Sequence, residues 1–239
     1  MTIKCLAFDL DGTLLLDGSK KIDPRTFDSI QKAMAQGMHI VIASGRDKNG
    51  CKFVYEPLRL EDGNHFLALV NGQVVYDFEN KEYDLDDVLT TEDGIKIQKV
   101  CKEFGVEGIF QCGYDFYSYI SSLNRVKKKV KNAILGEPDD YGLKDGRENR
   151  NFIDLPFEEI RLTQDINKVI MVHTPKFFEK NFDGIKAALS DYDVLLVGPD
   201  WLEIMPKHVS KASALWKICD KLGISMNEVM AFGDAQNDL

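Results

Sequence analysis

Residues 3–8, IKCLAF, form a short and nearly continuous apolar run that leads directly into two aspartates, Asp9 and Asp11. An apolar run of this length is typical of a parallel β-strand that is covered on both faces. Such a strand ends where ligands bind in open α/β sheets. The sequence therefore predicts that two carboxylates lie at the carboxyl edge of a buried sheet.

Helical and strand-like segments alternate over the first third of the chain. Asp23 is a suitable N-cap, Pro24 suits the first helical position and Gly37 suits the end of that helix. The expected elements are a strand at 3–8, a helix from 24, a strand at 38–44, a weaker helix at 47–58, a strand at 66–70 and, after the turn NGQ, its hairpin partner at 74–77. This order predicts an α/β fold with a doubly wound, mostly parallel, Rossmann-like sheet.

The pattern changes after Asp77, where strands are joined by short turns and helices lie between pairs of strands. The expected elements are helices near 90–104 and 176–190, strands at 106–112, 115–121, 168–174, 193–198 and 201–206, and a polar, glycine-rich passage at 136–151. We interpret residues 82–207 as an α+β cap domain inserted into a catalytic core of residues 1–81 and 208–239. The core pattern returns with a helix after Ser210, which ends at Gly223, and a strand in EVMAF, 228–232.

Composition excludes several classes of protein. Lys and Arg number 30 against 39 Asp and Glu, and the net charge of -9 disfavours nucleic acid as a partner. We expect a solvated helix face for the basic run NRVKKKVK, 124–131. The chain has no signal-peptide pattern and no apolar stretch long enough to span a bilayer, so we expect a cytoplasmic protein. Five scattered cysteines indicate reduced thiols, with neither a disulfide framework nor a structural zinc site.

Four distant segments carry the polar residues expected at one sheet edge. They are DLDGT at 9–13, SGR at 44–46, Lys211 at a helix start, and GDAQND at 233–238. Four of the carboxylates, those of Asp9, Asp11, Asp234 and Asp238, would repel one another unless a cation lay among them. A cluster without thiol or imidazole ligands predicts Mg²⁺.

Lys211 indicates an anionic ligand, because a cation in the first turn of a helix opposes the helix dipole. A phosphate group would accept hydrogen bonds from Lys211, from the Ser44 hydroxyl and from backbone N–H groups near Gly45. These groups together predict phosphoryl transfer. We expect Asp9 to be the nucleophile and Asp11 the general acid and base. Gly12 and Thr13 are expected to shape and brace the loop that carries both aspartates.

These segments, in this order, resemble the signature of the haloacid dehalogenase superfamily of phosphatases, and the long insert resembles the type IIB cap of its Cof-like branch. The resemblance implies that Asp9 becomes an aspartyl phosphate and binds Mg²⁺ with Asp234 and the backbone carbonyl of Asp11. It implies that Ser44 and Lys211 bind phosphate, and that Asn237 and Asp238 belong to the outer metal shell. Arg46, Asn71 and the hairpin segment 201–203 match substrate-facing positions only approximately.

The sequence departs from the family pattern after the last motif. Relatives usually continue beyond GDxxND with a strand and a helix, whereas this sequence stops at Leu239, so we expect an exposed sheet edge.

The predicted function is hydrolysis of small phosphomonoesters such as sugar phosphates by a monomer or homodimer. The alternatives are a phosphomutase or phosphotransferase with the same intermediate, and a noncatalytic phosphate-binding regulator.

Overall fold

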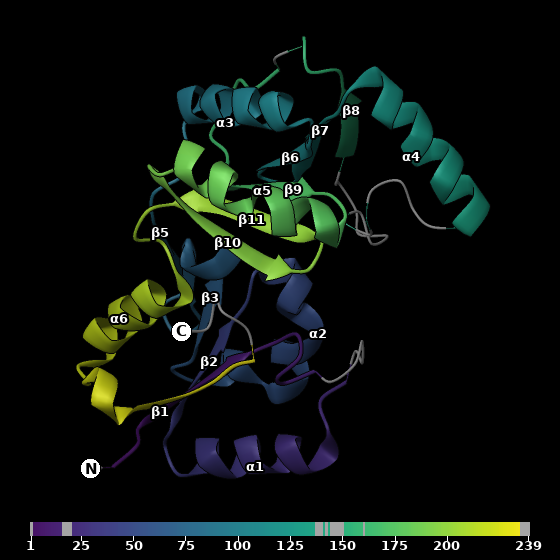
Figure 1. The fold of residues 1–239 in the computed structure, drawn as a ribbon. Coiled ribbons are helices and arrows are strands. Elements are labelled where there is room, and N and C mark those ends of the chain that lie inside the picture. Colours follow the sequence, from purple (N-terminus) through teal and green to yellow (C-terminus); the bar gives the residue numbers. More distant parts are fainter. Residues whose placement is uncertain are drawn as a thin grey trace. The chain divides into compact units, whose positions relative to one another are not determined.

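A computed structural model describes residues 2–15, 21–136, 141, 143, 151–159 and 161–234. The chain divides into two compact units (Figure 1). Unit 1 contains residues 1–87 and 208–239, and unit 2 contains residues 88–207.

Unit 1 is built on a mixed sheet, whose six strands within the described residues have the order β12-β1-β2-β3-β4-β5. The strands are β1 (Cys5–Asp9), β2 (His39–Ala43), β3 (Phe66–Leu69), β4 (Val74–Asp77), β5 (Glu82–Leu85) and β12 (Val229–Phe232). Strands β12, β1, β2 and β3 are parallel, whereas β4 and β5 are added as antiparallel strands. The predicted α/β sheet and the hairpin between β3 and β4 are therefore confirmed.

Helices cover both faces of this sheet, as a doubly wound fold requires. On one face, α1 (Pro24–Ala35) and α2 (Lys48–Leu58) bury Ile30 and Val54 against the strands. On the other face, α6 (Lys211–Leu222) buries Leu215 and neighbouring residues. The predicted caps form: the Asp23 side chain accepts the Arg25 backbone N–H at 2.9 Å, and Ser210 caps α6.

Unit 2 contains a second sheet, whose described strands have the order β10-β11-β9-β6-β7-β8. Its strands are β6 (Glu107–Cys112), β7 (Asp115–Tyr119), β8 (Asn151–Leu155), β9 (Lys168–Val172), β10 (Tyr192–Gly198) and β11 (Trp201–Pro206). All neighbours pair antiparallel except β7 and β8, which are parallel. Strand β8 was not predicted, because its residues follow a polar passage and pair with a strand that precedes them by more than thirty residues.

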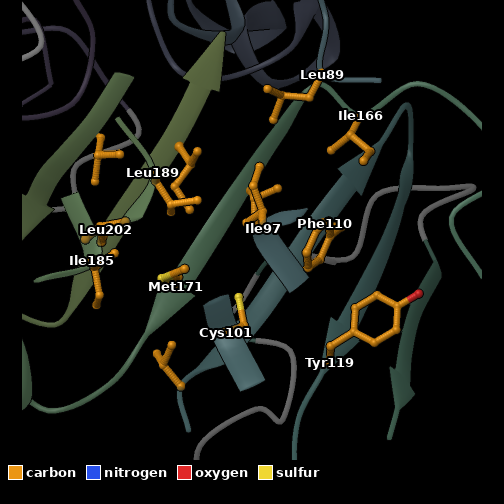
Figure 2. Close-up of a cluster of buried hydrophobic side chains, with 14 of the residues drawn as sticks. Leu89, Ile97, Cys101, Phe110, Tyr119, Ile166, Met171, Ile185, Leu189 and Leu202 are labelled. Atoms are coloured by element: carbon orange, nitrogen blue, oxygen red, sulfur yellow. The ribbon is translucent and has the colours of Figure 1, made fainter. Parts of the chain in front are cut away.

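Two helices, α3 (Thr91–Phe104) and α5 (Pro175–Ala188), close the core of unit 2. Figure 2 shows Ile97 and Cys101 of α3 together with Phe110, Met171 and Leu202 from the strands. These side chains are at most 2% exposed. The helices therefore pack their apolar stripes on one face of the sheet, which gives unit 2 a core of its own.

Two expectations need correction. The insert was predicted to begin at residue 82, but β5 pairs with β4 in the sheet of unit 1, so the first boundary falls after Asp87. The basic run lies on α4 (Ser122–Leu135) and is not simply a solvated face, because the Lys128 side chain is only 9% exposed whereas Val126 and Val130 are 61% and 56% exposed. Lys128 turns inward because it pairs with the buried Glu107 carboxylate at 2.7 Å.

The five cysteines are all buried and free, which agrees with the predicted absence of a disulfide framework. Burial raises the pKa of the Cys5 thiol to about 12 and that of Cys112 to about 11. Within the described ranges, no helix is both long enough and apolar enough to cross a membrane.

Candidate active site

Asp9, the last residue of β1, and Lys211, the first residue of α6, form a buried ion pair. The Lys211 Nζ atom donates to Asp9 Oδ1 at 2.5 Å, and the two side chains are 6% and 8% exposed. Ser210 caps the helix, so Lys211 stands in its first turn as predicted. Strand β1 and helix α6 therefore bring together residues that are 202 positions apart in the chain.

Asp11 lies in the loop after β1 and is held by Arg46. The Arg46 Nε and Nη2 atoms donate to Asp11 Oδ2 and Oδ1 at 2.8 and 2.7 Å, a bidentate pair. The hydrogen bond to Asp11 raises the pKa of the Arg46 guanidinium, which also lies 5.7 Å from the centre of the Phe53 ring. This pairing was not predicted. It points the Asp11 carboxylate towards Arg46, whose role was expected to be near the substrate.

Asp234 lies against the same loop. The Thr13 Oγ1 atom donates to Asp234 Oδ1 at 2.7 Å, so Thr13 braces the loop as expected. Gly12 has a φ of +88°, and a Cβ atom at this position would lie 2.4 Å from Asp234 Oδ2. Only glycine therefore allows Asp234 to approach the loop so closely. Strands β1 and β12 are paired neighbours, which explains why their carboxyl ends deliver Asp9 and Asp234 to one place.

Ser44 follows strand β2 and is 1% exposed. Its Oγ atom accepts the Arg46 backbone N–H at 3.2 Å. Ser44 does not cap the next helix, because Asp47 does so by accepting the Gly50 N–H at 2.7 Å. Asn71 is also buried, and its Oδ1 atom lies 3.0 Å from where a Cβ atom at Gly45 would stand. The structure thus places Ser44, Gly45, Arg46 and Asn71 in one set of touching segments.

Within the described part of the chain, no three His, Cys, Asp or Glu side chains gather closely enough to hold a metal ion. The side chain of Asp11 is turned to Arg46, and the predicted residues Asn237 and Asp238 lie outside the described residues. Oxygen donors remain at this edge, namely the carboxylates of Asp9 and Asp234 and the backbone carbonyl of Asp11. An all-oxygen set with few protein ligands fits Mg²⁺, which usually keeps several waters.

Sequence reasoning missed one part of the site, the turn at 70–72 that follows β3. Val70 and Asn71 have φ values of 49° and 55°, and Gly72 has a φ of 98°. The dipeptide Asn71-Gly72 was a visible signal for a turn, but only for a hairpin. The left-handed conformation of Val70, a β-branched residue, has no local sequence signal.

Segment 201–203 lies on β11 of unit 2. There Glu203 Oε1 accepts from Lys168 Nζ at 2.5 Å and from Trp201 Nε1 at 3.3 Å.

A family model described as haloacid dehalogenase-like hydrolase matches residues 6–239. The chain belongs to the haloacid dehalogenase-like hydrolases. The match includes every residue of the site described above, so the resemblance of the four segments is confirmed at the level of the family.

Relatives of this hydrolase cover nearly its whole length. A Streptococcus pyogenes protein, named as a candidate phosphatase, is 31% identical over 247 residues, which cover 100% of this chain and 83% of the relative. The Bacillus subtilis 5-amino-6-(5-phospho-D-ribitylamino)uracil phosphatase YcsE is 27% identical and covers 99% of this chain and 79% of its own. Among solved structures, a sugar phosphatase of haloacid dehalogenase subclass IIB superposes with a TM-score of 0.71 at 21% identity, covering 98% and 82% of the two chains. That structure supports the fold of a Rossmann-like core with a type IIB cap.

Proposed function

We propose that this hydrolase is a Mg²⁺-dependent phosphatase that acts on small phosphomonoesters through an aspartyl phosphate. The observation that carries the proposal is the buried Asp9 carboxylate, which Lys211 holds at 2.5 Å at the end of β1. A carboxylate at a fixed position can attack phosphorus as a nucleophile, and a neighbouring ammonium can stabilise the charge of the transferring phosphoryl group.

In the proposed first step, Asp9 forms an O–P bond while the bond between phosphorus and the ester oxygen breaks. Asp11 donates a proton to the departing alkoxide. In the second step, water attacks phosphorus, Asp11 accepts a proton from that water, and inorganic phosphate leaves as Asp9 is restored. Asp11 accepts from Arg46 on both oxygens in this structure, so it must turn from Arg46 before it can donate a proton.

The residues that would hold Mg²⁺ are Asp9, Asp234 and the backbone carbonyl of Asp11, with Asp238 in support. When bound, Mg²⁺ would neutralise charge on the phosphoryl group. Ser44 and the backbone near Gly45 would bind phosphate oxygens beside Lys211. The contact between Thr13 and Asp234, at 2.7 Å, supports this arrangement because it orients one of the carboxylates.

The substrate class is a small phosphorylated metabolite, and a sugar or sugar-alcohol phosphate is the first choice. This choice is supported by relatives that are named as a sugar phosphatase and as a phosphatase of a phosphoribityl compound. We also propose that unit 2 acts as the cap domain, that Arg46, Asn71 and segment 201–203 contribute to substrate binding, and that the protein is cytoplasmic and works as a monomer or homodimer.

The test is release of inorganic phosphate from a panel of phosphorylated metabolites, with and without Mg²⁺. Asp9→Asn should lower turnover by more than about 10³-fold, because the amide is a poor nucleophile. Asp23→Asn is the matched control, since it makes the same change at the cap of α1, where Asn also serves. Activity retained in Asp9→Asn would contradict the assignment. An isomeric sugar phosphate instead of inorganic phosphate would indicate a phosphomutase, and phosphate binding without turnover would indicate the regulator.

A further inference from the structure

The turn at 70–72 is held in an unusual conformation for its sequence. Three successive residues, Val70, Asn71 and Gly72, have positive φ values of 49°, 55° and 98°. All three are buried. Two non-glycine residues in the left-handed region, one of them β-branched, persist only where the surroundings impose that conformation. Two neighbouring segments impose this conformation, the loop after β2 and the start of α6.

One side of the turn holds the loop that follows β2. The Asn71 backbone N–H donates to the Ser44 carbonyl at 3.0 Å, and the Val70 N–H donates to the Arg46 carbonyl at 3.0 Å. A Cβ atom at Gly45 would lie 3.0 Å from Asn71 Oδ1. The turn and the loop are therefore bonded along their backbones, and each fixes the position of the other.

The other side of the turn supports the start of α6. A Cβ atom on Gly72 would lie 1.9 Å from the Ser210 carbonyl oxygen and 2.4 Å from its carbon. The same oxygen accepts from the Ser213 hydroxyl at 2.8 Å and from the Ala214 N–H at 3.1 Å. The Ser210 peptide therefore lies between the Cα atom of Gly72 on one side and, on the other, the first turn of α6, whose Ser213 hydroxyl and Ala214 N–H donate to the Ser210 carbonyl.

This peptide carries Lys211, whose ammonium meets Asp9 at 2.5 Å. We propose that the 70–72 turn and the Ser210–Ser213 cap together position Lys211 on Asp9, with Gly72 and Ser213 as positioning residues. Any side chain at Gly72 must displace the Ser210 carbonyl by about 1 Å, and an error of that size in a catalytic group can cost about 100-fold in rate. The inference deepens the proposed function, because it explains how the lysine of that site is set.

The main test compares Gly72→Ala with Gly223→Ala. Gly223 ends the same helix, has a φ of +63° and has open space around its Cβ position, so its substitution introduces backbone strain without a clash. We expect Gly72→Ala to lower kcat about 10- to 100-fold with a smaller change in KM. Gly223→Ala should keep kcat within about twofold, although both variants should melt at a lower temperature.

Combining these substitutions with Lys211→Ala distinguishes an effect on the position of Lys211 from a general loss of structure. In a Lys211→Ala background, Gly72→Ala should change the remaining rate by less than about twofold, because the group that it displaces is already absent. Ser213→Ala is a milder second variant, which removes the Ser213 hydroxyl bonds to the Ser210 backbone without a clash and leaves the Ser210 cap in place. It remains informative if Gly72→Ala does not fold. It should lower kcat severalfold in the wild-type background and have no further effect in Lys211→Ala.

A readout without substrate is the reaction of lysines with an amine-directed ester, followed by mass spectrometry. Lys211 should be protected in the wild type and react severalfold faster in Gly72→Ala and Ser213→Ala. Lys128 of unit 2, whose side chain is 9% exposed, serves as an internal reference. Unchanged labelling of Lys211 in these variants, or an equal loss of rate in the Lys211→Ala background, would overturn the proposal. If the wild type hydrolyses no phosphomonoester, the proposed function fails, and the labelling still decides whether Lys211 is positioned in this way.

Discussion

Both units bury ion pairs between a lysine and a carboxylate, and one pair from each unit shows how different their surroundings are. Lys211 meets Asp9 at 2.5 Å in unit 1, and Lys128 meets Glu107 at 2.7 Å in unit 2. Glu107 also accepts from the Ser118 hydroxyl and the Tyr141 hydroxyl, both at 2.6 Å. Asp9 instead ends a strand, beside a loop that carries further carboxylates and phosphate-binding candidates.

The comparison teaches that a buried ion pair does not by itself identify a catalytic site. Removing two charges from water is unfavourable in both units, and the attraction between them offsets much of that cost. Lys128 is further enclosed by aromatic rings, with its Nζ atom 4.2 Å from the ring centre of Tyr141 and 5.2 Å from that of Phe152. The charges of the Lys128–Glu107 pair are thus satisfied by the protein, and we expect this pair to serve stability. We propose that the Lys211–Asp9 pair serves turnover.

Replacing each lysine tests this difference most strongly. Lys211→Ala should lower the rate of phosphate release by about 10²- to 10³-fold, because the negative charge on the transferring phosphoryl group would no longer be stabilised by the Lys211 ammonium. Lys128→Ala breaks an equally buried pair and should keep kcat of the folded enzyme within about threefold. Steady-state kinetics of the two variants, after each is shown to be folded, would refute the contrast if their losses were equal.

Glu107→Gln tests the stability role of the pair in unit 2. The amide leaves the Lys128 ammonium, on a side chain that is 9% exposed, without its counter-ion, which should lower the free energy of unfolding by about 3 kcal/mol. Denaturant unfolding followed by fluorescence measures the change. A loss below about 1 kcal/mol would show that the network around Glu107 contributes little.

His65 sharpens the comparison, because it is a buried titratable group that carries no ion pair among the described interactions. Its Nδ1 atom accepts the Ile40 N–H at 3.0 Å, and burial, with a smaller effect from His39, lowers the pKa of His65 to about 4. In the unfolded chain His65 has its ordinary pKa near 6.5, so below that pH the unfolded state binds a proton that the folded state does not. The protein therefore keeps its full free energy of unfolding above pH 6.5 and loses about 3 kcal/mol of it as the pH falls from 6.5 to 4.

His65→Asn is the variant that checks this pH dependence, since Asn keeps an acceptor but cannot be protonated. Unfolding free energies measured from pH 7 to pH 4 should fall less steeply in His65→Asn than in the wild type. Parallel curves for the two proteins would assign the acid sensitivity to other groups.

Thr13→Val tests the smallest effect, the brace between the loop and Asp234. The variant removes the 2.7 Å hydrogen bond but keeps the shape of the side chain. The Mg²⁺ concentration for half-maximal activity should rise about tenfold, as is usual when a group that orients a metal ligand is lost. A shift in kcat with no change in the Mg²⁺ requirement would place Thr13 elsewhere in the reaction.

Local signals explain why much of unit 1 could be predicted. Asp23-Pro24 at one helix start and Ser210 and Gly223 at the ends of another are strong caps, and the apolar strands ended where the polar motifs began. Strand β5 was assigned to the wrong unit because it is short and mostly polar, with the sequence EYDL, as edge strands often are.

Partners within the site could not be predicted in the same way. The sequence predicted Asp9, Asp11, Arg46 and Lys211 as residues of one site. Which carboxylate meets which cation depends on how β1, β2 and α6 come together. The conformation of the 70–72 turn and the inward orientation of Lys128 were also invisible, because they are imposed by contacts with distant segments and not by neighbouring residues.

The central claim is that Asp9 accepts the phosphoryl group. Its most direct test is to mix Asp11→Asn, in which hydrolysis of the intermediate should be slow, with a substrate found in the panel, and to quench the reaction in acid. Peptide mapping should then find a phosphoryl group on Asp9 in an amount close to that of the enzyme. A phosphoryl group on another residue, or none on Asp9 while the quenched enzyme has already released product, would contradict the account.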